Sequence, residues 1–479
     1  MSVVLIYPAI PFEEGERFPT RTLSPPLGIL YIASYLREKG IDVEIVDQNG
    51  ERISNEEVVK RVVRKSPVLI GFSVVAWQAR GAVELSKIIR EKLPNVHIVF
   101  GGIHVTLNPI RMMQKYPHID SIITGEGEQA TLNLLRALQT NRSLQDVPGI
   151  YYRKNGMIKI GAPRRLISHL DELPFPAREL VNMNWYGQIE GLRFPRMTTI
   201  LSSRGCPYAC SFCCLVSFSE RKWRARSPEN IVNEIEELLS LGYKMIFFVD
   251  DNFTMRQKRI RRICQLIKRR RLDFDWFFEG RVDQINYEVA RNAVKSGCKI
   301  IYLGIESANQ KCLDYYNKRT TPQMAQQAVV TARRAGTDIV LGTFIVGAPG
   351  ETVQEVQNTI DFAMKLDIDF PQFNTLGALV GTKIWDSLVS EGHIDYEKYW
   401  ETGVQVPEVH PDSVPQEILL RMIVDGYDKF ILRKRFIARE IRRFLSSSFR
   451  LRLLAHNLTK GSILKQFVRG ELSQKKLYQ

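Results

Sequence analysis

The chain has 479 residues and a formal net charge of +15, with 44% apolar and 25% charged residues. This length predicts two or three domains, and the composition is that of a globular protein, which excludes disorder as the default. Seven cysteines and no apolar signal near Met1 favour a reducing cytoplasm over secretion. No apolar run approaches the roughly 18 residues of a membrane span, so we expect no transmembrane helix.

Residues 1–140 show short apolar runs that alternate with helical patterns. Strands are expected at 3–7, 42–46, 69–73, 96–100 and 121–124, with helices at 26–40 and 82–93 among the segments between them. Buried strands separated by helices predict an α/β domain with a doubly wound, Rossmann-like parallel sheet. Ligands of such sheets bind beyond the carboxyl ends of the strands.

Small and polar residues gather at that expected edge. They are Asn49, Ser73, Gly101, Gly102, His104, Gly125, Glu126 and Gly127. Glycine allows the backbone to approach a flat or phosphate-bearing ligand closely, which favours a nucleotide-like cofactor. No G-x-G-x-x-G opens the first helix, so NAD is disfavoured. A flavodoxin-like partner domain without a cofactor is the alternative.

Residues 141–195 read as a connector between two domains. A hairpin is expected around the Asn155-Gly156 turn, followed by a proline-punctuated extended segment at 170–176. We assign no chemistry to this segment.

The most informative stretch is a loop with Cys206, Cys210 and Cys213, at spacings of three and two intervening residues, followed at once by Cys214. Three thiolates on one loop fit a four-iron four-sulfur cluster that leaves one iron without a protein ligand. A zinc site completed by Cys214 or by a distant histidine is one alternative, and incidental buried cysteines are another.

Residues 196–400 continue as a strand and helix repeat. Strands are expected at 245–249, 276–280, 300–305, 337–347 and 373–379, and Ser227-Pro228 begins a helix. The repeat predicts a partial TIM-like (βα)6 barrel, with its functional groups at the carboxyl ends of the strands. Polar residues and glycines fall there; they include Asp250, Asp251, Arg281, Glu306 and Gly347. We interpret Trp276 as barrel filling, and Cys264, Cys298 and Cys312 as spectators.

Residues 401–479 form a basic C-terminal region. From Arg433 onward, 13 Lys and Arg residues stand against two acidic ones, and aliphatic residues interleave with them. The pattern predicts basic amphipathic helices. Three interpretations are open: helices packed on the barrel, contact with the anionic inner face of a membrane, and nucleic acid, which is disfavoured because no recognition module accompanies the charge.

The cysteine loop, with Phe212 before its last cysteine, resembles the cluster loop of radical S-adenosylmethionine (SAM) enzymes. In that family SAM chelates the open iron, and its reductive cleavage yields a 5′-deoxyadenosyl radical. The resemblance implies that Phe212, Asp250 and Asp251 lie near SAM, with the two aspartates meeting its amine. It further implies that Arg281 and Glu306 meet its carboxylate and ribose, and that Gly347 passes beside its adenine.

The N-terminal domain resembles the cobalamin-binding domain of one branch of this superfamily. The resemblance rests on Pro25-Pro26-Leu27-Gly28, Gly101-Gly102-Ile103-His104 and Gly125-Glu126-Gly127-Glu128. Related cobalamin domains carry an Asp-x-His-x-x-Gly motif whose histidine ligates cobalt, whereas this chain has Asp47-Gln48-Asn49-Gly50. The resemblance therefore implies cobalamin held with its base detached and no imidazole from this stretch.

Together these features imply a cobalamin-dependent radical SAM enzyme, with C-methylation of an unactivated carbon as the first expectation. Oxidative cyclisation or ring rearrangement, as in anaerobic magnesium-protoporphyrin ester cyclases, is the second, and a non-catalytic cobalamin or redox sensor is the third. The implied partners are a small-molecule substrate, with a lipid or tetrapyrrole favoured by the basic tail, and a flavodoxin or ferredoxin reductant. A further expectation is that truncation after Asp428 leaves cofactor binding intact and weakens liposome association.

Overall fold

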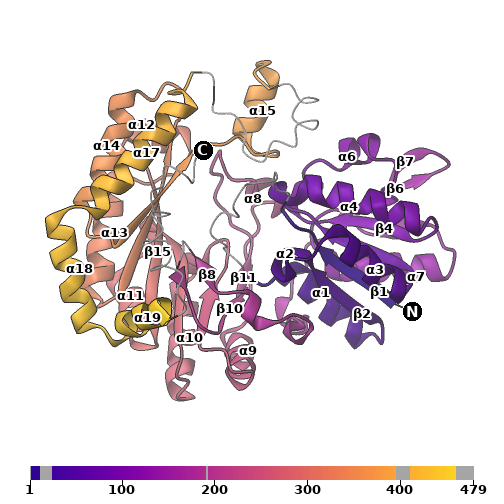
Figure 1. Ribbon diagram of the computed structural model, residues 1–479, viewed down its shortest axis with the longest axis horizontal. Helices are drawn as coiled ribbons and strands as arrows, with labels where there is room; N and C mark the ends of the chain where they lie inside the picture. The colour runs from indigo at the N-terminus through magenta and orange to yellow at the C-terminus, as the bar shows by residue number, and fades with distance from the viewer. Residues whose placement is uncertain (1, 11–23, 190–191, 395–409, 411, 460–479) are drawn as a thin grey trace.

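The computed structural model describes residues 2–10, 24–189, 192–394, 410 and 412–459. In this part of the chain two α/β bodies lie side by side, and the C-terminal helices cover the outer side of the second one (Figure 1). The first body is the doubly wound α/β domain expected from the sequence, and the second is the expected barrel.

The first body is built on a seven-stranded sheet in the order β2-β1-β3-β4-β5-β6-β7. Five strands are parallel: β1 (Ser2–Tyr7), β2 (Asp42–Asp47), β3 (Leu69–Ser73), β4 (His97–Gly101) and β5 (Ser121–Ile123). The expected hairpin forms β6 (Ile150–Lys154) and β7 (Met157–Ile160), and it extends this sheet antiparallel to β5 instead of standing apart as a connector. The first sheet therefore runs to residue 160.

Helices cover both faces of this sheet, as a doubly wound fold requires. One face packs against α1 (Leu27–Glu38) and α7 (Gly127–Gln139). The other packs against α3 (Asn55–Lys65), α4 (Ala79–Lys92) and α6 (Pro109–Lys115). Shorter helices α2 (Gln48–Glu51) and α5 (Ile103–Thr106) follow β2 and β4 at the carboxyl edge.

The second body is a parallel six-stranded sheet in the order β10-β13-β14-β15-β16-β17. Its strands are β10 (Met197–Ile200), β13 (Met245–Phe248), β14 (Asp275–Arg281), β15 (Cys298–Glu306), β16 (Ile339–Val346) and β17 (Phe370–Thr375). The outer layer consists of α9 (Pro228–Ser240), α10 (Gln257–Arg269), α11 (Tyr287–Lys295), α13 (Pro322–Arg334) and α14 (Val353–Lys365). This confirms the predicted (βα)6 architecture, although β17 begins three residues earlier than expected.

Alternation along β14 separates the two faces of the barrel wall. Trp276 and Phe278 are fully buried against the outer helices, and the Trp276 indole N–H donates to the Ser296 carbonyl at 2.9 Å. Phe277 points inward and stacks on Phe247, with ring centroids 4.2 Å apart. Because side chains alternate along a strand, Glu279 and Arg281 share the inward face with Phe277.

Three helices follow the barrel: α17 (Gln416–Ile431), α18 (Lys434–Ser446) and α19 (Ser448–Thr459). Phe449 and Leu453 of α19 pack with Phe277 and Ile300 at the amino ends of the strands, so α19 closes the barrel floor. Among the described residues, no helix is both long and apolar enough to cross a bilayer. Other short α-helices in the described ranges are α8 (Leu215–Phe218), α12 (Gln310–Tyr315) and α15 (Lys383–Ser390).

Candidate active site

The cysteine loop lies directly after β10 and β11 (Ser203–Arg204), at the carboxyl end of the barrel. Its entry is fixed by Gly205, whose N–H donates to Asp251 Oδ2 at 2.6 Å. Gly205 has φ +85°, and a Cβ there would lie 2.1 Å from the Lys222 carbonyl oxygen, so only glycine fits. Further along, the Ser211 N–H and Oγ donate to the Tyr316 and Tyr315 carbonyls. The loop is therefore held at both ends.

The spacing of the three cysteine sulfurs favours a cluster over a single metal ion. Among the described residues, the sulfurs of Cys206, Cys210 and Cys213 do not all lie within 4.8 Å of one another. Two thiolates on one zinc ion, each about 2.3 Å from it, are at most about 4.6 Å apart. A cluster that presents a separate iron to each thiolate accommodates wider spacing, so the donor set fits the implied iron–sulfur cluster.

Arg281 is the cationic neighbour of the cluster loop. Its guanidinium stacks on the Tyr208 ring, with the central carbon 3.7 Å from the ring centroid, and Nη1 lies 3.9 Å from Cys210 Sγ. Nε and Nη2 also donate to the two oxygens of Asp283, and Nη2 donates to the Lys318 carbonyl at 2.7 Å. Most of its donors are thus engaged, which leaves Arg281 suited to stabilising charge on the loop more than to gripping a carboxylate with two bonds.

Glu306 ends β15 in a strained conformation. Its φ is +69°, in the left-handed region that a non-glycine side chain adopts at a cost. The buried carboxylate pairs with Lys318 Nζ at 2.5 Å, and Lys318 lies 5.9 Å from the centre of the Phe212 ring. Phe212 in turn packs edge-on against Tyr316. Glu306 and Phe212 therefore face one region beside the cysteine loop, joined by a lysine.

The two adjacent aspartates have different surroundings. Asp250 is buried and accepts hydrogen bonds from the Ser202 N–H at 2.7 Å, the Ser202 hydroxyl at 2.6 Å and the Ser203 hydroxyl at 2.5 Å. Its oxygens are therefore occupied by the barrel wall in this structure, and the expected contact of Asp250 with the SAM amine stays a prediction. Asp251 faces the space between the domains, where enclosure by protein raises its pKa to about 6.

A cavity of about 270 Å³ lies between the carboxyl edge of the first sheet and the cysteine loop. Six of the eight residues expected at a cobalamin site line it: Ser73, Gly101, Gly102, Gly125, Glu126 and Gly127. Gly102 has φ +99°, and a Cβ there would meet the Val74 carbonyl oxygen at 2.6 Å. The cavity continues along the sheet face past Gly28, Gly71 and Val99. It is a slot for a slender group and is too small to enclose a whole corrin ring.

Asn49 and His104 do not line this cavity. Asn49 lies in α2 beside Asp47, and His104 is buried in α5, where burial lowers its pKa to about 4. No histidine occurs among the described residues that line the cavity.

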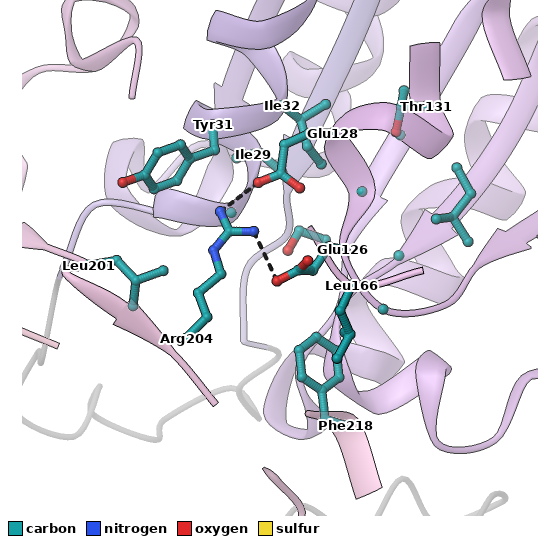
Figure 2. Close-up of a pocket in the computed structure, with 18 of the residues that line it drawn as sticks. Ile29, Tyr31, Ile32, Glu126, Glu128, Thr131, Leu166, Leu201, Arg204 and Phe218 are labelled. Atoms are coloured by element: carbon teal, nitrogen blue, oxygen red, sulfur yellow. Dashed lines mark hydrogen bonds and ion pairs between the residues drawn. The ribbon is translucent and has the colours of Figure 1, made fainter. Parts of the chain in front are cut away.

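Arg204 joins the cysteine loop to the cobalamin edge. Its guanidinium reaches Glu128 Oε1 at 2.6 Å and Glu126 Oε1 at 3.2 Å, and it lies over the Tyr31 ring (Figure 2). Burial alone would lower the pKa of Arg204, but Glu128 and Glu126 outweigh it and raise the pKa above its ordinary value. Glu126 also binds Arg224 Nη1 at 2.9 Å. The two cofactor regions thus share one buried charge network.

Comparison with known proteins decides the family. A model of the radical SAM superfamily matches residues 200–363, and a model of the B12 binding domain matches residues 20–135. An uncharacterized methyltransferase of Pyrococcus horikoshii is 34% identical over 476 residues, which is 98% of this chain and 98% of the relative. The chain belongs to the cobalamin-binding radical SAM enzymes. The expected cofactors, a 4Fe–4S cluster, SAM and cobalamin, are thereby confirmed.

More distant relatives of this radical SAM enzyme carry other activities. The anaerobic magnesium-protoporphyrin IX monomethyl ester cyclase of Rubrivivax gelatinosus is 27% identical over 86% of this chain and 75% of the relative. The solved structure of the radical SAM methyltransferase TsrM from Kitasatospora setae, with cobalamin and a 4Fe–4S cluster bound, has a TM-score of 0.68 at 19% identity. It covers 81% of this chain and 78% of that chain, which confirms the fold.

Some residues of the radical SAM site were not anticipated from sequence. Lys318 belongs to no motif, and Arg204 stands out only as the residue before Gly205-Cys206. Gln284 is a further example, since its amide donates to the Tyr208 hydroxyl at 3.0 Å. Asn252 was visible as part of the polar strand end 250–252, but its position 3.8 Å from Cys206 Sγ was not. The available signal was the position of Asn252 and Gln284 just after strands, where polar residues of such barrels gather. Gly347, at φ +91°, donates its N–H to Glu351 Oε2 at 2.7 Å.

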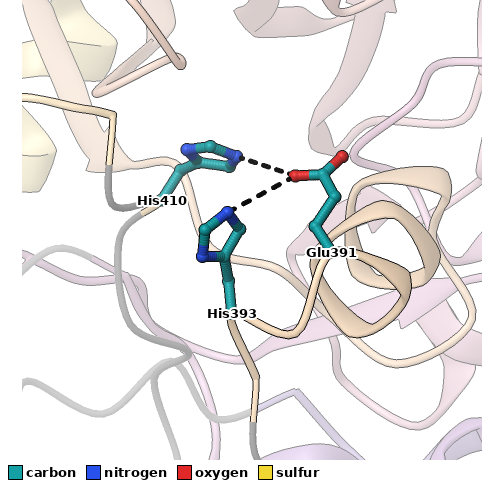
Figure 3. Close-up of side chains that lie close together, drawn as sticks. All are labelled: Glu391, His393 and His410. Carbon is teal, nitrogen blue, oxygen red and sulfur yellow. Dashed lines mark ion pairs between the residues drawn. The ribbon is translucent and has the colours of Figure 1, made fainter.

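A second group of metal-ligand side chains lies beyond α15 in this radical SAM enzyme. His393 Nε2 and His410 Nε2 both approach Glu391 Oε2, at 3.7 and 3.8 Å (Figure 3). His410 Nδ1 accepts the Asp412 N–H at 3.1 Å, so the ring proton of the neutral form lies on Nε2 and points at the carboxylate. In that neutral form Nε2 carries the proton and offers no lone pair to a metal ion.

Proposed function

We propose that this enzyme transfers a methyl group to an unactivated carbon of a small-molecule substrate. The observation that carries the proposal is the contact between the two cofactor regions: Arg204, two residues before the first cluster cysteine, pairs with Glu126 and Glu128 at the cobalamin edge, and Arg204 and Gly205 both line the cavity there. When bound, the cluster and SAM supply a hydrogen-abstracting radical, and cobalamin supplies the methyl group. The name of the methyltransferase from Pyrococcus horikoshii supports this choice.

For cobalamin, the proposal assigns the glycine-rich edge to the corrin and the slot to the detached nucleotide arm. Ser73, Gly101, Gly102, Gly125 and Gly127 let the backbone approach the ligand, and the slot past Gly71 gives a slender arm a place to enter. A cofactor whose base is detached would need such a place for that base.

For SAM, the proposal retains Phe212, Asp250, Glu306, Gly347 and Arg281 as neighbours, and Asp250 also holds Ser202 and Ser203. Glu306 is held by Lys318 with one oxygen, which leaves the other for an ammonium or a ribose hydroxyl. The Gly347 loop is pinned by Glu351 and by Ser413, whose hydroxyl donates to the Gly347 carbonyl at 2.8 Å.

The side chains inside the barrel indicate which chemical groups the substrate carries. Glu279 projects into the barrel interior, and its side chain is open to that space. The surrounding protein keeps much of the bulk water away from the carboxyl group. This desolvation, and to a smaller extent the charge of Glu306, raises the pKa of Glu279. Beside it the Tyr302 hydroxyl donates to Gln372 Oε1 at 2.7 Å. These groups favour a substrate with polar functions over a pure hydrocarbon. The basic helices lie at the opposite end of the barrel, so they give no support to the expectation of a lipid or tetrapyrrole substrate.

The test uses reconstituted, cobalamin-loaded enzyme under anaerobic reducing conditions. Methyl-labelled SAM is supplied with cell extract, and the products are separated by chromatography. The proposal predicts labelled methyl in an extracted metabolite together with 5′-deoxyadenosine. Formation of 5′-deoxyadenosine without transfer of the label would argue against methylation and favour cyclisation, the reaction for which the Rubrivivax gelatinosus relative is named. Failure to cleave SAM at all would favour a sensor.

A further inference from the structure

The helix α18 turns two of its arginines, Arg439 and Arg443, toward the barrel. Arg439 Nη1 binds Asp367 Oδ1 and its Nη2 donates to the Ile368 carbonyl, both at 2.8 Å. Arg443 Nη2 binds both oxygens of Asp367 at 2.8 Å, and its Nη1 reaches Asp369. These acidic residues lie in the turn before β17. Part of the C-terminal positive charge is therefore used to dock α18 on the barrel.

The opposite face of α18 is aliphatic and exposed. Ile437, Ile441 and Leu445 are 44%, 56% and 76% exposed, and a spacing of four residues places them in one stripe. Leu432, just before the helix, is 71% exposed. An amphipathic helix on a globular protein ordinarily buries its apolar stripe, and an exposed one marks an interaction surface.

Basic side chains border this stripe. Lys434, Arg435 and Arg442 are exposed, and within the described part of the chain none of them forms an ion pair. On the helix, Lys434 lies about one turn before Ile437, and Arg442 follows Ile441 directly. Aliphatic residues with a cationic border are the pattern of helices that lie flat in a lipid interface.

We propose that α18 docks this enzyme on an anionic phospholipid surface, with Ile437, Ile441 and Leu445 inserted and the three basic residues at the head groups. Charge complementarity favours an anionic lipid surface over the other partners that could cover this face. A second copy of the chain would bring another net charge of +15 against the same basic border. Residues 460–479 carry five basic residues and one acidic residue, so they would meet like charge as well.

This docking is separate from the proposed catalysis. Asp367 and Asp369 precede β17, so α18 lies at the amino ends of the barrel strands, whereas the cysteine loop lies at their carboxyl ends. Figure 1 shows α18 on the outer side of the barrel, away from the cobalamin-binding domain. The surface therefore locates the enzyme without requiring that its substrate be a lipid.

The structure also changes how docking has to be tested. Truncation after Asp428 would remove Phe449 and Leu453, which close the barrel floor, along with the arginines bound to Asp367 and Asp369. We now expect it to damage the barrel, contrary to the expectation from sequence. Substitutions on the exposed face avoid this problem.

The experiment is co-sedimentation of the full chain with vesicles of phosphatidylcholine alone or mixed equally with phosphatidylglycerol. We expect binding to the anionic vesicles only. The triple variant Lys434→Gln, Arg435→Gln, Arg442→Gln should bind about a hundredfold more weakly, since each charge contributes about fivefold. The variant Ile441→Ser, Leu445→Ser should lose at least about tenfold. The control Met157→Ser, Ile160→Ser removes two exposed aliphatic residues on β7 and should bind normally.

Three results would overturn the proposal. One is equal binding to neutral and anionic vesicles. Another is loss of binding on deletion of residues 460–479 while the α18 variants bind normally. A third is a dimer in sedimentation velocity that the Ile441→Ser, Leu445→Ser variant converts to a monomer, since this would make a second copy the occupant. Thermal unfolding of each variant checks that the fold is intact.

Discussion

The buried charge network around Arg204 gives the sharpest prediction about how the two domains are joined. The perturbation is Arg204→Met, which keeps most of the side chain's length and removes its charge. Arg204, Glu126 and Glu128 side chains are 13%, 5% and 4% exposed, so this network is nearly desolvated. Glu126 would keep Arg224 and the Ile167 N–H, whereas Glu128 would lose the cation that binds it at 2.6 Å.

The magnitude follows from that asymmetry. Removing one partner of a buried ion pair costs about 3–5 kcal/mol, because the remaining charge stays desolvated without compensation. The double variant Arg204→Met, Glu128→Gln removes the stranded charge, so its cost should not exceed that of Arg204→Met alone. The matched control is Arg37→Met, whose ion pair with Glu179 has side chains 44% and 56% exposed and should contribute at most about 1 kcal/mol.

The assay is denaturant unfolding of cofactor-free protein under reducing conditions, followed by fluorescence, with all variants compared at one pH. A cost of Arg204→Met no larger than that of Arg37→Met would refute the reasoning. Strict additivity of Arg204→Met and Glu128→Gln, within about 0.5 kcal/mol, would refute it too, because contacting residues should couple.

Three further predictions concern individual residues. Asp250→Asn should lower the free energy of unfolding by about 2 kcal/mol, because an amide cannot replace the carboxylate toward both Ser202 groups and Ser203. Asp251→Asn should not lower it, because the amide oxygen can still accept the Gly205 N–H and the substitution removes a carboxylate whose enclosure raises its pKa. Denaturant unfolding at pH 7 measures both, and equal losses would contradict the assignment. Burial raises the pKa of Asp47 from 3.8 to about 6. Between these two pH values the folded chain therefore holds a proton that the unfolded chain has lost. The contribution of this proton to the free energy of unfolding, on the order of 3 kcal/mol, is complete below about pH 4 and is lost as the pH rises through 6. Stability measured against pH should lose that component in Asp47→Asn, and an unchanged profile would contradict the pKa. Cys206→Ser, Cys210→Ser and Cys213→Ser should each lose the cluster's visible absorption and iron after anaerobic reconstitution, while Cys264→Ser, buried among the outer helices, should keep both.

Much of the fold follows from local sequence patterns. Short apolar runs bounded by polar residues mark the buried strands, and the glycines at the first sheet's edge are visible because a close backbone approach needs them. In contrast, β10 is only Met197–Ile200, with two threonines, and it has no distinguishing pattern. The hairpin β6–β7 was visible, but its pairing with β5 depends on contacts distant in the sequence.

The sequence motifs of the site were predictable, but the hydrogen-bond and ion-pair partners of its residues were not. The spacing of Cys206, Cys210 and Cys213 identifies them without a structure. The sequence places Asp250 and Asp251 at one strand end but cannot show that the serines satisfy only the first. Likewise, Lys318 meets Glu306 through tertiary packing alone.

The orientation of α18 was hidden for a related reason. Its amphipathic pattern predicts an aliphatic face turned inward, but Asp367 and Asp369 at the barrel floor bind Arg439 and Arg443 instead. Tertiary charge partners thus decide which face of the helix is buried.

The most direct test of the account is electron paramagnetic resonance of the reduced, reconstituted protein with and without SAM. The account predicts a 4Fe–4S signal that changes when SAM is added, because one iron lacks a protein ligand, and loss of that signal in the Cys206→Ala, Cys210→Ala, Cys213→Ala variant. A signal that SAM leaves unchanged, or one that survives the triple substitution, would contradict an open iron held by these three cysteines.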